Sequence, residues 1–219
     1  WSGSDSWLKI SKVENFLNNL FSHYDSIGID AYVINFTGGE PTVWKGFQQM
    51  CLALKKLDNV FLTMTTNGRT VNKRFWNDVS KAFYRIYVSY HSESANHNQL
   101  IDNLKRMSSH TNVTLRIMMH HQKKYWNKCV DFIDAVREEC DKGTININYI
   151  LTPLQKNYGT DNRELFEYNE EMLQYIKDNM EYKSINFFGM STYSELQPIM
   201  YFANGEFDFV SPSKLISND

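Results

Sequence analysis

The chain contains 219 residues, of which 42% are hydrophobic and 15% aromatic, and its formal net charge is −2. This composition excludes an intrinsically disordered protein, and the near-neutral charge gives no electrostatic basis for binding nucleic acid or an anionic membrane surface. No apolar run approaches the ~20 residues that a membrane-spanning helix needs, so we expect no membrane partner.

Helical and strand-like patterns alternate along the first two thirds of the chain. The first helix is predicted to have Ser11 as its N-cap, because Glu14 follows at capping-box spacing and apolar residues then recur at helical intervals. Later helices are marked by apolar sets that begin at Val43, Phe75, Leu100 and Trp126. The strand-like runs between them are residues 31–36, 60–65, 85–91, 113–119 and 145–151.

The spacing of these runs, roughly 24 to 32 residues, is that of a β-strand followed by a crossover helix. Strict alternation predicts an α/β fold with a parallel sheet. The residue pattern alone leaves open whether that sheet curls into a partial barrel or forms a doubly wound open sheet.

The pattern changes after Pro153. Apolar residues from Leu165 to Ile176 predict a last helix, and residues 185–188 a short strand. Asn204-Gly205 lies between aromatic runs, which predicts a hairpin over residues 201–209 with a type I′ turn. We therefore expect a domain of residues 1–153 and a C-terminal helix and hairpin extension of residues 154–219.

The cysteine content indicates a reducing compartment. Cys51, Cys129 and Cys140 are odd in number and far apart, which argues against a disulfide framework and for a cytoplasmic protein. Each falls on the apolar stripe of a predicted helix, where a free cysteine behaves as a small hydrophobic side chain. We therefore expect none of them to bind a metal.

The most informative segment is the corner at residues 37–41, where a β-branched run stops at two glycines, an acid and a proline. Gly38 and Gly39 permit positive φ values and leave the peptide groups bare, while Pro41 suits the first turn of a helix. This arrangement predicts a strand-to-helix corner with bare peptide groups, at which the Glu40 carboxylate faces whatever lies above the strand. The alternative is a plain βα turn in which Glu40 interacts with the helix dipole.

Further candidate residues lie where other strands end, because ligands of parallel βα folds gather at the carboxyl edge of the sheet. Thr66 and Asn67 follow the second run. Ser89 shares strand parity with Tyr87 and His91, so it is either a ligand contact or a plain interior hydroxyl. Arg116 lies mid-strand and needs a partner if buried, either a ligand carboxylate or a structural salt bridge.

Several other polar residues near strand ends are weaker candidates. Adjacent histidines on a strand point to opposite faces, so His120 and His121 are not expected to ligate one ion together. Asn148, Tyr149 and Tyr158 are considered as residues that line a substrate space.

Two segments resemble motifs of the radical S-adenosylmethionine (radical SAM) enzymes. Phe-Thr-Gly-Gly-Glu-Pro-Thr at residues 36–42 is similar to their GGEP motif, which holds the amino group of the methionine moiety. Thr-Thr-Asn-Gly at residues 65–68 resembles the Thr-Asn-Gly that often ends their third strand. The resemblance implies a partial (β/α)6 TIM-like barrel. It also implies S-adenosylmethionine as a cofactor, bound by Thr37, Gly38, Gly39, Glu40, Pro41, Thr66, Asn67, Ser89 and Arg116.

The three-cysteine CxxxCxxC motif of that family is absent from the 219 residues. The resemblance therefore implies a [4Fe–4S] cluster whose ligands, like the first barrel strand, lie upstream of Trp1 in a longer protein. With that cluster and a reductant, the expected activity is formation of a 5′-deoxyadenosyl radical that abstracts hydrogen from an unknown substrate. The alternative is a degenerate, non-catalytic barrel that acts as a binding protein.

Overall fold

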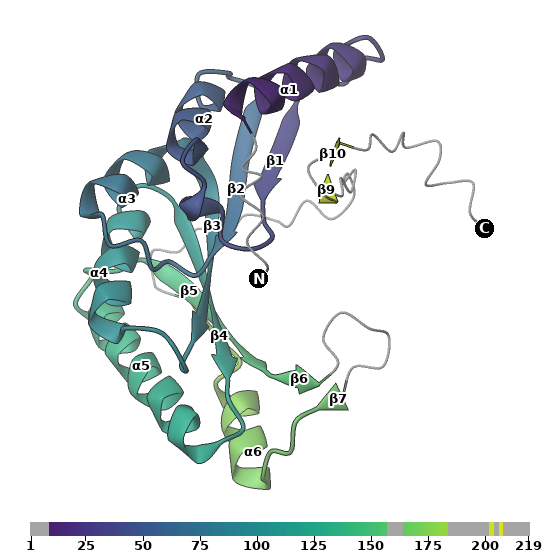
Figure 1. Ribbon diagram of the computed structural model, residues 1–219. Coiled ribbons are helices and arrows are strands. Elements are labelled where there is room, and N and C mark those ends of the chain that lie inside the picture. Colours follow the sequence, from purple (N-terminus) through teal and green to yellow (C-terminus); the bar gives the residue numbers. More distant parts are fainter. Residues whose placement is uncertain (1–8, 157–163, 184–201, 204–205, 208–219) are drawn as a thin grey trace. The chain divides into compact units, whose positions relative to one another are not determined.

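The computed structural model describes residues 9–156, 164–183, 202–203 and 206–207 (Figure 1). The chain divides into two compact units, and each is described by itself. The larger unit is formed by residues 31–188, and the smaller by residues 1–30 together with residues 189–219.

The larger unit is built on a six-stranded sheet in which strands follow one another in chain order. Its first five strands are parallel, and the last pairs antiparallel with the fifth. The order never reverses, so the sheet lacks the switch point of a doubly wound fold. The strands are β1 (Tyr32–Phe36), β2 (Val60–Thr66), β3 (Phe83–His91), β4 (Asn112–Met119), β5 (Ile147–Pro153) and β8 (Glu181–Lys183).

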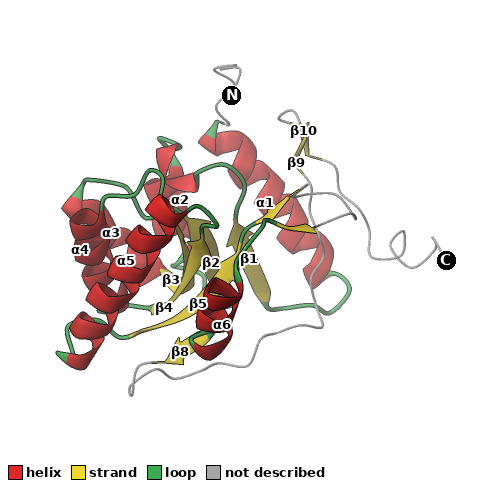
Figure 2. Cartoon of the chain, turned by 90° about the horizontal axis from the view of Figure 1, so that it is seen from below, coloured by secondary structure: helices red, strands yellow, loops and turns green. Residues whose placement is uncertain are grey.

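Helices connect the strands and lie along one side of the sheet. Figures 1 and 2 show the helices from α2 to α5 following one another along that side. Trp126 of α5 meets Tyr175 of α6 edge to face, with ring centroids 5.6 Å apart, so the last helix packs beside α5. The helices are α2 (Phe47–Leu54), α3 (Lys73–Val79), α4 (His97–Ser108), α5 (Lys123–Asp141) and α6 (Glu170–Asp178), with 3-10 turns η1 (Pro41–Val43) and η2 (Ser80–Ala82).

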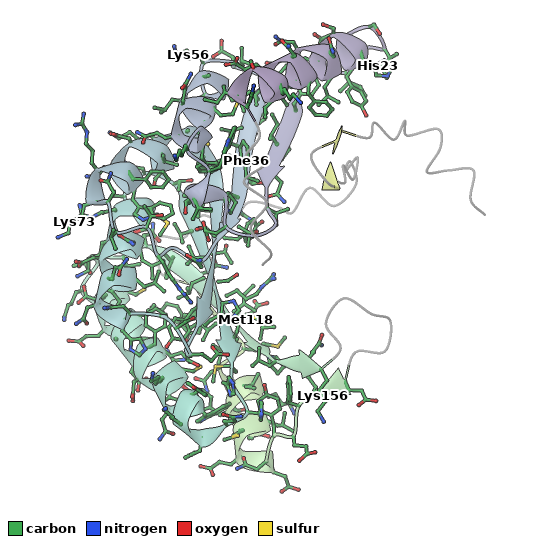
Figure 3. All side chains as sticks on the ribbon, viewed as in Figure 1. His23, Phe36, Lys56, Lys73, Met118 and Lys156 are labelled. Carbon is green, nitrogen blue, oxygen red and sulfur yellow. The ribbon has the colours of Figure 1, made fainter. Side chains whose placement is uncertain are left out.

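Alternate residues of each strand therefore meet different surroundings. In β4, Leu115 and Ile117 are fully buried against the helices, whereas Arg116 between them is exposed. In Figure 3, Met118, which lies on the same side of β4 as Arg116, is labelled at the strands. Lys73 of α3 is labelled at the outer edge of the helices. We call the second side of the sheet the helix-free face, since no described helix of this unit covers it. Its polar side chains include Asn35, Thr63, Thr65, Tyr87, Ser89, Arg116 and Asn148.

The core under the helices is rich in aromatic rings. Phe47 of α2 packs against Phe36 and Phe83, with ring centroids 5.2 Å and 6.1 Å away. Tyr90 of β3 stacks on Phe132 of α5 at 4.1 Å. Large rings at the contact between helices and strands bury much apolar area, and this packing fixes the sheet under its helices.

The smaller unit contains the helix α1 (Ile10–Asp25) and the antiparallel pair β9 (Phe202–Ala203) and β10 (Glu206–Phe207). The pair confirms the predicted hairpin, while its turn and the strand expected at residues 185–188 lie outside the described residues. Ser11 as an N-cap was wrong. The amides of Lys12 and Val13 already bond to the carbonyl of Lys9, so the helix begins two residues earlier than the capping box suggests.

Three other element boundaries differ from the predictions. Val43 lies in η1, and extended backbone at Trp44 separates that turn from α2. Strand β3 begins at Phe83, two residues before the predicted run of residues 85–91. Leu165 belongs to β7 (Glu164–Leu165), which pairs with β6 (Gln155–Lys156), so α6 starts later than predicted. No helix in the described part of the chain combines the length and apolar character needed to cross a membrane.

Candidate functional site

The corner after β1 has the backbone that its glycines suggested. Gly38 and Gly39 have φ values of +80° and +44°, in the left-handed region that L side chains rarely adopt. A Cβ atom added to Gly38 would meet nothing within 4 Å, so backbone conformation and not crowding requires glycine there. The corner therefore exposes bare peptide groups at the carboxyl edge of the sheet.

The Glu40 carboxylate turns towards the end of β2. Its Oε1 accepts hydrogen bonds from the Thr66 hydroxyl at 2.7 Å and from the hydroxyl and amide of Thr42 at 2.7 Å and 3.2 Å. Its Oε2 accepts one hydrogen bond, from the backbone amide of Asn67 at 2.7 Å. Glu40 thus joins the β1 corner to the β2 terminus. Since Oε2 has a single donor among the described residues, a lone pair remains for a ligand.

The loop after β2 is held from the other side by α4. The Asn103 side-chain amide, which is buried, donates to the carbonyls of Gly68 at 2.7 Å and Thr70 at 3.0 Å. The Gln99 amide donates to the carbonyl of Arg69 at 2.5 Å. These bonds satisfy three successive carbonyls of an irregular segment, so the loop is fixed without regular secondary structure.

Strand register places three of the predicted residues at one height of the sheet. Thr66 pairs with Val88, and Ser89 pairs with Arg116. Asn67, Ser89 and Arg116 therefore form a row that crosses β2, β3 and β4, over a width of roughly 10 Å at the usual strand spacing. We call these three residues the row. It begins beside Glu40, because the Asn67 amide is bonded to that carboxylate.

Arg116 projects from the helix-free face and is exposed. It makes no hydrogen bond or ion pair with any residue that the structure describes. The structural salt bridge that the sequence left open for Arg116 is therefore not formed with any described residue. The guanidinium is left as a permanent cation with its donors available.

His120 and His121 do not point to opposite faces, and that expectation was wrong. Strand β4 ends at Met119, so the period-two rule no longer applies, and the two rings stack with centroids 4.7 Å apart. His120 Nδ1 accepts the amide of Gln122 at 3.0 Å, and burial lowers the pKa of His120. Among the described residues, no group of three or more His, Cys, Asp or Glu side chains could hold a metal ion.

The residues considered for a substrate space separate in the structure. Tyr149 lies on the helix-covered face, where its hydroxyl accepts a bond from Arg137 Nε at 2.6 Å, and burial raises its pKa to about 12. Tyr149 was therefore wrongly placed in that space. Asn148 is on the helix-free face and accepts the Thr114 hydroxyl at 2.8 Å. Tyr158 lies outside the described residues.

The cysteines have the environments that the apolar stripes indicated. Cys51 and Cys129 are buried and Cys140 is half-buried, each on a helix. Burial raises the pKa of all three thiols, which disfavours the thiolate that ligates iron. The described residues therefore do not provide the ligands of a [4Fe–4S] cluster.

Sequence reasoning missed the residues that shape the site without belonging to a motif. Asn103 occupies a position on the apolar stripe of α4, between the buried Leu100 and Met107. A polar residue on such a stripe is a usable signal, because a buried amide needs partners. Gln99, Thr42 and Arg69 carry no comparable signal, since each becomes informative only through its contacts.

No protein-family model matches the chain, and no curated protein matches it either.

Proposed function

We propose that the chain is a radical SAM-type domain that binds S-adenosylmethionine along the corner and the row. The observation that carries the proposal is the placement of one acid and of one cation that is unpaired among the described residues. Glu40 and Arg116 flank Asn67 and Ser89 along one line across the strands. An amino acid moiety carries an ammonium and a carboxylate, so this pair of charges matches both of its ionic groups.

Each residue has a distinct part in this proposal. The free lone pair of Glu40 Oε2 and the bare carbonyls of the glycine corner accept the ligand ammonium. The Arg116 guanidinium pairs with the carboxylate, and the Ser89 hydroxyl bonds to the ribose. The partial (β/α)6 barrel is the corresponding proposal for the fold. It is supported by parallel strands in chain order and by helices on one side of them.

A [4Fe–4S] cluster would supply the electron that cleaves S-adenosylmethionine to the 5′-deoxyadenosyl radical. The described residues do not fit that group, because their cysteines lie in the helix layer and no three suitable ligands converge. Catalysis therefore requires ligands from outside the 219 residues, together with a reductant. The same observation favours a second candidate function, a SAM-binding barrel without radical chemistry.

Calorimetric titration of the 219-residue chain with S-adenosylmethionine tests the binding claim. We expect saturable binding, weakened about tenfold or more in Arg116→Gln and unchanged in Arg74→Gln. Arg74 is a suitable control because it is exposed on α3 and pairs with Asp78. A folded wild-type chain that binds no S-adenosylmethionine, or equal losses in both variants, would contradict the proposal.

Anaerobic addition of iron and sulfide separates the two functions. The 219-residue chain alone should develop no visible charge-transfer absorbance. If the chain extended upstream of Trp1 gains that absorbance and cleaves S-adenosylmethionine, the enzyme is supported. If the extended chain binds the ligand and gains no cluster, the non-catalytic binding protein is supported.

A further inference from the structure

A second group of polar side chains lies just beyond the row, where the loops after β2, β3 and β4 meet. We call it the rim cluster: Arg69, His91, Glu93, Ser94 and His120. The Arg69 guanidinium donates a hydrogen bond to the Ser94 hydroxyl, which joins the first two loops. His120 Nε2 lies 3.6 Å from Glu93 Oε1, which joins the second and third.

The backbone of Arg69 in the rim cluster is fixed by hydrogen bonds to two neighbouring side chains. The Arg69 amide donates to the Asn67 side chain at 3.0 Å, and its carbonyl accepts from Gln99. His91 is the last residue of β3. An arginine whose backbone is fixed in this way presents its guanidinium at a defined position, which lowers the entropy lost when it binds a ligand.

The two formal charges of the rim cluster, on Arg69 and Glu93, form no ion pair with each other. Arg69 forms no ion pair with a carboxylate in the described ranges, since its side-chain partner Ser94 is neutral. The one acid of the cluster, Glu93, faces His120. His120 Nδ1 accepts an amide, so its ring proton is on Nε2, on the side of Glu93. The Arg69 charge has no ion-pair partner among the described residues and is therefore available to an external anion.

His91 lies within the electrostatic field of both charges. Burial lowers the pKa of His91, Glu93 opposes that effect, and the nearby Arg69 adds to it. The uncharged form of the ring is therefore favoured, and in that form one ring nitrogen can donate a hydrogen bond. An anion bound beside Arg69 would favour the protonated ring, because it would offset the positive field of the guanidinium.

The rim cluster is distinct from the row that is proposed for S-adenosylmethionine. His91 follows the row residue Ser89 by two positions, which is roughly 7 Å along an extended strand. Arg69 follows Asn67 by two positions in the irregular loop after β2. A ligand group held there lies further out from the sheet than the row, on the side where a second molecule would enter.

We propose that the rim cluster binds an oxyanion, carboxylate or phosphate, of the substrate, with Arg69 as the anchoring cation and His91 as a hydrogen-bond donor. Its assignment to the substrate rests on the proposed function, whereas oxyanion binding at Arg69 does not. The substrate is thereby restricted to small molecules that carry such a group.

Titration of the 219-residue chain with pyrophosphate and, separately, with malonate tests the proposal and distinguishes the two oxyanions. We expect one of them to bind, about tenfold or more weakly in Arg69→Gln and unchanged in Arg74→Gln. Affinity should rise as the pH falls through the titration of His91, and less so in His91→Gln. S-adenosylmethionine binding by Arg69→Gln should equal that of the wild type.

Resonances of the arginine Nε–H groups in the wild-type chain provide a readout that needs no variant. The Arg69 signal should shift on addition of the bound oxyanion, while that of Arg74 stays in place. The proposal is overturned if neither oxyanion binds, if Arg116→Gln abolishes binding and Arg69→Gln does not, or if the Arg69 signal is unmoved. Oxyanion binding at Arg69 without S-adenosylmethionine binding would instead remove the proposed function and leave the oxyanion site standing.

Discussion

The two faces of the six-stranded sheet are made by the same strands, yet their side chains are of opposite character. On the covered face, Ile86, Val88 and Leu115 are fully buried. On the helix-free face, polar groups bond to one another across strands, as Thr63 does to Asn35 at 3.0 Å. Buried apolar packing dominates folding energy, whereas exposed neutral hydrogen bonds contribute little. The covered face therefore sets stability, and the helix-free face retains capacity for a ligand.

Neighbouring residues of β4 give the most severe test of this difference. Leu115→Ala should lower the free energy of unfolding by about 2–5 kcal/mol, because it leaves a cavity against the helices. Arg116→Ala should change it by no more than about 0.5 kcal/mol, because its side chain is exposed. Urea unfolding followed by circular dichroism measures both. Similar losses in the two variants would mean that the faces do not differ as described.

The Glu40 contacts show that part of the ligand edge is also structural. Glu40→Ala removes the acceptor of the Thr66 hydroxyl and the Asn67 amide, so we expect a loss of about 1–3 kcal/mol in unfolding free energy. Glu138→Ala is the matched control, because that acid is exposed and, among the described residues, pairs with Lys142, the C-cap of its own helix. Equal stability of the two variants would show that Glu40 is not needed to join β1 to β2.

Asn103 extends the same test to the helix side of the loop. Asn103→Ala leaves the carbonyls of Gly68 and Thr70 without their donor, and we expect a loss of about 1–2 kcal/mol. Asn98→Ala, at an exposed position of α4, should be close to neutral. Thermal unfolding of both variants is the measurement. An unchanged melting temperature in Asn103→Ala would place the support of this loop elsewhere.

The smallest effect concerns pH, and it again compares the two faces. Burial lowers the pKa of His97, whose Nε2 lies 2.6 Å from the Tyr90 hydroxyl under the helices, and of His91 on the helix-free face. The unfolded chain then binds more protons than the folded one, so stability falls as the pH drops through about 6.5. His97→Gln should flatten this dependence in urea unfolding, and the exposed His110→Gln should not. An identical pH dependence in wild type and His97→Gln would contradict the assignment.

The fold was accessible from the sequence because its strands are long, regularly spaced and rich in β-branched residues. All five predicted parallel strands are present, within a few residues of their expected bounds. The errors fall where periodicity stops being informative. His120 and His121 follow the last residue of β4, where strand alternation ends. Ser11 lies inside α1, which begins at Ile10 after the N-cap Lys9.

The site was only partly accessible for a related reason. The glycines and the acid at the end of a strand can be read directly from the sequence, and strand parity put Ser89 on the side of Tyr87 and His91. The register that sets Ser89 opposite Arg116 came only from the structure. The pairing of Glu40 with Asn67, or of Arg69 with Ser94, joins residues more than twenty positions apart. Such contacts depend on how loops pack, and no local pattern specifies that packing.

Gly68 and its contacts define a sequence signature by which relatives of this chain can be recognised. Its φ is +67°, and a Cβ there would approach a side-chain carbon of Leu100 to 2.7 Å. The Asn103 side chain donates a hydrogen bond to its carbonyl. Two residues on one turn of α4, Leu100 and Asn103, therefore contact the same glycine. A Leu-x-x-Asn pair that accompanies a distant Thr-Asn-Gly is therefore a compound signature. Because it couples two segments through space, it would discriminate homologues from chance better than the short glycine motif alone.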